Sequence, residues 1–189
     1  MRRRTLLASA GAGAGAMLAG PGLSAAPAEA AGTPTLRTYA VQGTDIAVAL
    51  LPGPAATVLL YAARRFHYEI DALRPGDLVT DASGTVLDIR PGWYPAGARD
   101  GFLPYQKIVV HDIVAQCDGL LGWGGDARTP REGRFEIAVA PADHRLRALA
   151  RRLDTDAAWP SRRVGAGIAL PFTADRVRRA QSIRRGMAR

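Results

Sequence analysis

Two aspartates, Asp81 and Asp88, bracket the Ser-Gly-Thr turn of the stretch VTDASGTVLDI. About fifty residues downstream, the stretch EGRFEI carries Glu132 and Arg134, followed by Glu136. Carboxylates in such positions can hold a metal cation, transfer protons, or accept hydrogen bonds from the fork of an arginine. A pair such as Asp81 and Glu132 also has the composition of a glycosidase pair, although any acidic turn near an acidic strand shares it.

The elements that position these residues follow from the spacing of apolar side chains. Alternation and turn signals predict strands over residues 45–51, 84–89, 120–126 and 134–140. Three- and four-residue spacing predicts helices over residues 57–73, 104–119 and 143–153. In the last strand the apolar residues alternate onto one face, so Glu132, Arg134 and Glu136 are expected to share the opposite face.

The N-terminus has the pattern of a secretory signal. Consecutive arginines in MRRRTLL precede an uncharged Ala/Gly-rich run, and Ala28-Glu29-Ala30 supplies a small-x-small cleavage site. The Arg-Arg-x-Leu-Leu order favours the twin-arginine export route. The run is too rich in Gly and Pro for a membrane span. We expect residues 1–30 to be cleaved and the mature protein to be secreted, with no segment that spans the membrane.

The rest of the chain is expected to comprise a leader over residues 31–44 that can extend into an edge strand, one domain over residues 45–153 and a tail over residues 154–189. Residues 1–30, 31–144 and 145–189 carry net charges of +2, −3 and +9, which give the formal +8 of the chain. Because the basicity lies in the tail, the domain does not have the charge of a nucleic-acid-binding protein. The tail is expected to be disordered or loosely helical, and either to aid solubility or to attach to an anionic cell-surface polymer.

The order of these segments resembles the D-alanyl-D-alanine carboxypeptidase family of zinc peptidases, the M15 type. In that family a segment S-x-H-x-x-G-T-A-x-D supplies a histidine and an aspartate to zinc. A later segment E-x-H-F-x-I supplies a catalytic glutamate and a third ligand. The resemblance spans about residues 73–153 and rests on ASGTVLDI, PYQKIVVHDIVAQCDG, GWGGD and EGRFEI. It implies an α+β fold, with a small, mainly antiparallel sheet and packed helices, and a function at the peptidoglycan of the cell wall.

The departures from that family fall on the metal ligands. Asp81 stands at the position of the first histidine and Asp88 at that of the aspartate ligand. Glu132 stands at the position of the catalytic glutamate and Arg134 at that of the final histidine. Arginine has no lone pair for a metal and repels one, whereas its fork can bridge Asp81 and Asp88. We therefore expect no cofactor, with zinc replaced by an ion cluster centred on Arg134.

Other metal sites remain open. His67, His111 or His144 could supply a nitrogen ligand, although none of them lies at a ligand spacing. An all-oxygen site for calcium or magnesium would use Asp81, Asp88, Glu132 and Glu136, and the charge of Arg134 opposes it.

Further side chains are assigned by their surroundings in the sequence. Trp93, Tyr94, Trp123 and Asp126 are expected to line the cleft, and the aromatic ones either contact a peptide or sugar or pack at the edge of the core. The single cysteine, Cys117, lies on the apolar stripe of a predicted helix, so we expect a buried thiol and not a nucleophile. Ser83 belongs to no G-x-S-x-G elbow.

Two functions follow from these assignments. The first is a catalytically degenerate module of the M15 type, exported to the cell surface, that binds peptidoglycan stem peptides through its cleft. The second is an active metallopeptidase that cleaves cell-wall peptides at an atypical site. In the second, Asp81 and Asp88 hold the metal and Glu132 activates water. Metal content distinguishes the two.

Overall fold

The computed structural model describes residues 34–157 and 171–187, except for the side chains of residues 155–157. Its elements in chain order are β1 (Arg37–Ala40), β2 (Ala47–Leu50), α1 (Pro54–Glu69), β3 (Leu78–Thr80), β4 (Val86–Ile89), α2 (Pro104–Gln116), β5 (Leu121–Trp123), the 3₁₀ helix η1 (Gly124–Asp126), β6 (Arg134–Ile137), α3 (His144–Ala157) and α4 (Ala174–Met187). Over these residues the fold is α+β, with four α-helices and two small antiparallel sheets, which confirms the predicted α+β class.

The larger sheet has four strands in the order β3-β4-β6-β5, and each neighbouring pair is antiparallel. The pairing of β4 with β6 places Leu87 opposite Phe135 and Asp88 opposite Arg134. Because side chains alternate along a strand, the apolar pair points into the core and the charged pair points away from it. The smaller sheet is the hairpin of β1 and β2.

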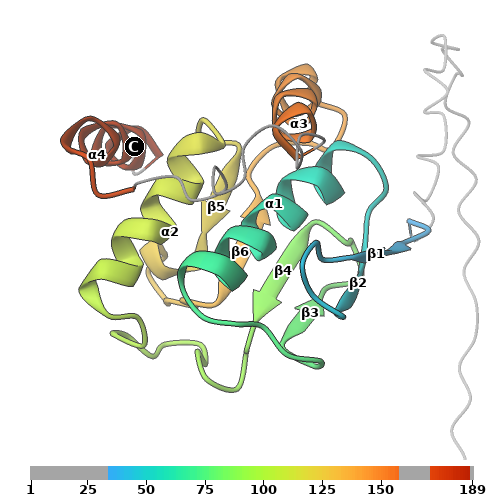
Figure 1. Cartoon of the computed structure of the whole chain (residues 1–189), viewed down its shortest axis with the longest axis horizontal. Helices are drawn as coiled ribbons and strands as arrows, with labels where there is room; N and C mark the ends of the chain where they lie inside the picture. The colour runs from blue at the N-terminus through green and yellow to red at the C-terminus, as the bar shows by residue number, and fades with distance from the viewer. Residues whose placement is uncertain (1–33, 158–170, 188–189) are drawn as a thin grey trace, which may run out of the picture. The chain divides into compact units, whose positions relative to one another are not determined.

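Helix α1 contacts the inner face of the larger sheet (Figure 1). Its apolar residues recur every three or four positions, and Leu59, Ala62 and Phe66 are fully buried. Pro54 lies in the first turn, where its missing N–H leaves no hydrogen bond unmade. Helix α3 packs against α1, and α2 packs against both α1 and β5. The sheet and three helices therefore share one core behind the charged face.

Most predicted elements are present with shifted ends. The strands predicted at 45–51, 84–89 and 134–140 correspond to β2, β4 and β6, and the three predicted helices correspond to α1, α2 and α3. The stretch 120–126 is a strand only as far as Trp123 and then turns into η1. Strand β3 was not predicted, because three residues are too few to show a period. Strand β1 lies inside the expected leader and pairs with β2, so part of that leader belongs to the domain.

Residues 174–187 of the tail form helix α4, which is the helical one of the two alternatives expected for this segment. Ala180 is the only buried residue among those of this helix, so apolar packing alone does not explain its position against α2. The arginines of α4 explain its position better, because three of them each contact an aspartate at 2.6 Å. These pairs are Arg176–Asp112, Arg179–Asp118 and Arg184–Asp126.

Parts of the expected organisation lie outside the described residues, namely the predicted signal over residues 1–30 and residues 158–170 and 188–189 of the tail. The domain expected to end at residue 153 continues through α3 to Ala157. Among the helices that the structure describes, none combines the length and the apolar character that a membrane crossing requires.

Candidate functional site

The outer face of the larger sheet gathers the charged residues of β4 and β6. Asp88 lies directly opposite Arg134, and Glu136 lies two residues further along β6. Asp81 comes two positions after Val79, the residue of β3 that faces Asp88. Residues two apart on a strand point to the same side. The outer face therefore carries Asp88, Arg134 and Glu136, and the predicted placement of Arg134 with Glu136 is confirmed. Asp81 lies in the turn beyond the end of β3, where the alternation of that strand does not fix its direction.

Arg134 binds Asp88 through both prongs of its guanidinium. Its Nε donates to Oδ1 at 2.9 Å and its Nη2 donates to Oδ2 at 2.7 Å. The Asp88 hydrogen bond, reinforced by the charges of Asp88, Glu136 and Asp81, raises the pKa of Arg134 above its ordinary value although burial opposes the shift. A second guanidinium, that of Arg131, has its Nη1 3.8 Å from Asp88 Oδ2. The carboxylate of Asp88 is therefore neutralised by arginine.

Asp81 is engaged within its own turn. Its two carboxylate oxygens accept hydrogen bonds from Ser83 Oγ at 2.8 and 2.7 Å, and the side chain is exposed. Ser83 Oγ also accepts a hydrogen bond from the Thr85 N–H, which closes the turn. The predicted arginine bridge consequently forms to Asp88 and not to Asp81. The charge of Asp81 still acts on Arg134, but only at a distance.

Glu132 does not share the outer face with Arg134, contrary to the expectation. It precedes β6, which begins at Arg134, so the alternation of the strand does not extend to it. Its carboxylate is only 6 % exposed and accepts backbone N–H groups from the loop before α2. Oε1 accepts from Asp100 at 3.2 Å, and Oε2 accepts from Gly101 at 2.6 Å and Phe102 at 3.2 Å.

The groups around Glu132 favour its role in anchoring the loop before α2. Lys107 Nζ lies 3.2 Å from Oε1 and compensates the buried charge. A Cβ atom on Gly101 would lie 3.0 Å from Oε2 and 2.8 Å from the Tyr94 ring, so only glycine lets the backbone approach this closely. Trp123 Nε1 donates to the Glu132 carbonyl at 2.6 Å. A carboxylate surrounded by donors in this way positions a loop, and it is poorly placed to take a proton from water.

The residues at the ligand-equivalent positions do not fit a catalytic zinc. Zinc needs about three protein donors around an open position, whereas here Asp88 carries an arginine and Glu132 lies in a separate buried contact. The histidines do not complete a set of zinc donors. His67 Nδ1 accepts the Leu73 N–H at 3.0 Å, His111 lies 3.8 Å from Asp126, and His144 lies 3.7 Å from Asp143. Over residues 34–157 and 171–187, no three His, Cys, Asp or Glu side chains are grouped to hold a metal ion.

The four expected cleft residues do not form one groove. Trp123 is buried, and Tyr94 packs on Phe102 with ring centroids 4.5 Å apart. Trp93 is 70 % exposed, with the Arg90 guanidinium 5.0 Å from its ring. Trp123 and Asp126 do line a cavity of about 370 Å³ together with Glu136. Helix α4 contributes Arg184 to the lining of this cavity. Packing at the edge of the core is thus the better description of Tyr94 and Trp123.

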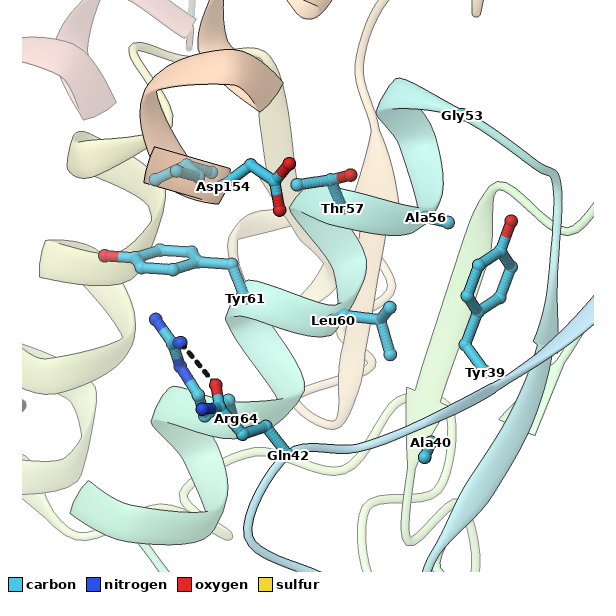
Figure 2. Close-up of a pocket in the computed structure, with 11 residues that line it drawn as sticks. Tyr39, Ala40, Gln42, Gly53, Ala56, Thr57, Leu60, Tyr61, Arg64 and Asp154 are labelled. Atoms are coloured by element: carbon cyan, nitrogen blue, oxygen red, sulfur yellow. Dashed lines mark hydrogen bonds between the residues drawn. The ribbon is translucent and has the colours of Figure 1, made fainter. Parts of the chain in front are cut away.

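Two further features were not predicted. A buried ion network joins Arg65 of α1 to Glu69 and to Asp112 of α2. Arg176 of α4 extends it with two hydrogen bonds to the same aspartate. The i,i+4 spacing of Arg65 and Glu69 was a signal in the sequence, but the partner on α2 was not recognisable there. The second feature is a cavity of about 420 Å³ between α1, β1 and α3 (Figure 2).

Comparisons with family models, curated proteins and solved structures give no match for this chain.

Proposed function

We propose that this protein is an exported, catalytically degenerate domain of the M15 peptidase type that binds peptidoglycan stem peptides at the cell surface. The observation that carries the proposal is the two-pronged contact of Arg134 with Asp88. In the resembled family these two positions hold zinc. Here Arg134 supplies a permanent cation, and this cation neutralises Asp88.

The loss of metal-dependent hydrolysis follows from the charges. A metal ion entering beside Asp88 would have to displace the guanidinium of Arg134 and would meet the charge of Arg131 as well. Glu132, the counterpart of the catalytic glutamate, has its lone pairs directed at three backbone N–H groups. Neither the Lewis acid nor the base of such a mechanism has a place in this arrangement.

Peptide binding is supported by the mixture of charges that remains on the outer face. Glu136 is exposed and lies beside the cavity that includes Trp123 and Asp126. Arg131 is 46 % exposed and presents a second cation 3.8 Å from Asp88. Stem peptides carry both carboxylates and amines, so a surface with separated charges of both signs is complementary to them.

The test restores the missing ligands. The double substitution Asp81→His with Arg134→His should create a site that binds one zinc ion together with Asp88, measured by calorimetry and by metal content after dialysis. The matched control, Asp81→His with Arg128→His, adds the same residues but places one of them outside the outer face and should bind no zinc. Failure of the first variant to bind zinc would show that the assigned positions do not correspond to a metal site.

The unsubstituted protein supplies the second arm of the test. We expect it to contain no stoichiometric zinc and to release no alanine from a soluble stem pentapeptide. Zinc that is removed by a chelator together with peptidase activity would instead establish the active metallopeptidase with its atypical site. Binding of the same pentapeptide, followed by NMR shifts of Glu136 and its neighbours, tests the recognition that we propose.

A further inference from the structure

A cavity of about 420 Å³ lies between the outer side of α1, the strand β1 and the C-terminal half of α3 (Figure 2). Its apolar floor is formed by Ala56 and Leu60. Two tyrosines bound it, with Tyr61 on α1 and Tyr39 on β1. Pockets of this size, with aromatic walls and a few polar groups, are typical of small-ligand sites. None of its lining residues belongs to the charged outer face of the larger sheet.

Helix α1 sets the length of the cavity. Thr57, Leu60, Tyr61 and Arg64 recur at steps of three and four residues, so they occupy one face of the helix. Thr57 and Arg64 are seven residues apart, which corresponds to about 10 Å along a helix axis. The polar ends of the cavity are therefore separated by an apolar middle section.

A cation lies at one end. Arg64 Nη1 donates to Gln42 Oε1 at 2.8 Å, and its guanidinium carbon is 5.8 Å from the centre of the Tyr61 ring. Both contacts orient the group without neutralising it. The next residue, Arg65, by contrast pairs with two carboxylates. Within the described part of the chain, no carboxylate forms an ion pair with Arg64.

An anion lies at the other end. Figure 2 shows the carboxylate of Asp154, in the last turn of α3, close to Thr57 and away from Arg64. No cation among the described side chains forms an ion pair with Asp154. The cavity thus presents two opposite charges at its two ends, and both remain able to form charge-assisted hydrogen bonds with a ligand.

We propose that this cavity binds a short peptide with free termini. Its ammonium group contacts Asp154 and Thr57, and its carboxylate contacts Arg64. An extended chain spans about 3.3–3.6 Å per residue, so three residues cover the rise of about 10 Å along α1 between Thr57 and Arg64. The middle of the peptide lies on Leu60 between the two tyrosines. This site is separate from the Asp88–Arg134 pair and does not depend on the function proposed for the outer face.

The experiment titrates the full chain with L-alanyl-L-alanyl-L-alanine and follows binding by calorimetry and NMR. The largest shifts are expected at Thr57, Tyr61 and Arg64. Acetylation of the N-terminus and amidation of the C-terminus should each weaken binding about tenfold, as expected for the loss of one charge-assisted hydrogen bond. Asp154→Asn and Arg64→Gln should have effects of the same size. The matched controls Asp45→Asn and Arg74→Gln remove the same charges from exposed positions outside the cavity and should leave the affinity unchanged.

Combining ligands with variants identifies the contacts. If Asp154 binds the ammonium group, acetylation of the peptide should not weaken its binding to the Asp154→Asn variant any further. If Arg64 binds the carboxylate, amidation should not weaken binding to the Arg64→Gln variant any further. The proposal is overturned if trialanine causes no shifts in the cavity, if the doubly capped peptide binds as tightly as the free one, or if the controls weaken binding equally. Asp88→Asn and Arg134→Leu should leave trialanine binding intact, so this test and that of the outer face fail independently.

Discussion

Arg134 and Asp88 face each other across β4 and β6, and the guanidinium of one lies in a two-pronged hydrogen bond with the carboxylate of the other. In the correspondence that we propose with the M15 peptidases, the pair stands at two metal-ligand positions. It joins the two central strands of the sheet in the same way that a bound ion would, by compensating the charge of Asp88 between them.

The first prediction concerns the strength of this pair. Arg134→Ala and Asp88→Ala, alone and together, should give a coupling free energy of about 1 kcal/mol in urea unfolding, because the groups are directly opposed and only partly exposed. The matched cycle on Arg178 and Asp175, which are 68 % and 89 % exposed, should give a coupling close to zero. Equal coupling in the two cycles would show that the cross-strand geometry adds nothing.

A second prediction separates a structural from a catalytic role for Glu132. Glu132→Gln should lower the free energy of unfolding by about 2–3 kcal/mol, because it turns an amide group toward backbone donors and leaves Lys107 facing a neutral group. Glu136→Gln, the same change four residues along and exposed, should stay within about 0.5 kcal/mol. Denaturant unfolding of both variants provides the measurement. A stable Glu132→Gln protein would contradict the anchoring role.

The third prediction concerns the attachment of α4 at low pH. Burial alone would raise the pKa of Asp118, but the hydrogen bonds and charges of Arg152 and Arg179 outweigh it and hold that pKa below its ordinary value. The pKa of Asp126 is lowered in the same way by His111 and Arg184. A carboxyl with a lowered pKa stabilises the folded state above its unfolded pKa of about 4, and this contribution is lost as pH falls through the folded value.

Helix α4 should therefore loosen as the pH drops below about 4, while α1 keeps its packing. The NMR amide shift of Ala180 reports on α4, and that of the fully buried Ala62 serves as the internal control. The double substitution Asp118→Asn with Asp126→Asn should loosen α4 already at pH 7 and abolish the acid step. Simultaneous transitions of both amides would mean that global unfolding and not α4 release is being observed.

The fourth prediction is that Cys117 does not react in the folded protein. Its side chain is fully buried, and burial raises the pKa of the thiol to about 12. The reactive thiolate is therefore nearly absent at neutral pH. Ellman's reagent should label no cysteine in the native state at pH 8 and one cysteine per chain in 6 M guanidinium. Rapid labelling of native protein would contradict the packing of α2 against the core.

The local pattern of the sequence was sufficient for the elements that repeat a period. The stripes of α1 and α2, the alternation in β6 and the burial of Cys117 all depend on neighbours within a few residues. The pairing of Asp88 with Arg134 was predicted from their unlike charges together with the resemblance, which assigned both residues to one site. Glu132 was misplaced because the alternation was extended past the first residue of its strand.

The remaining features depend on contacts between residues far apart in the chain, which no local period encodes. The register of β4 against β6 placed both prongs of Arg134 on Asp88 and left Asp81 to Ser83. The packing of α3 and β1 on α1 created the cavity between Arg64 and Asp154. The basic charge of residues 145–189 follows directly from the sequence. Only the tertiary structure paired the arginines of α4 with Asp112, Asp118 and Asp126. Ion pairs form where folding brings unlike charges within a few ångströms.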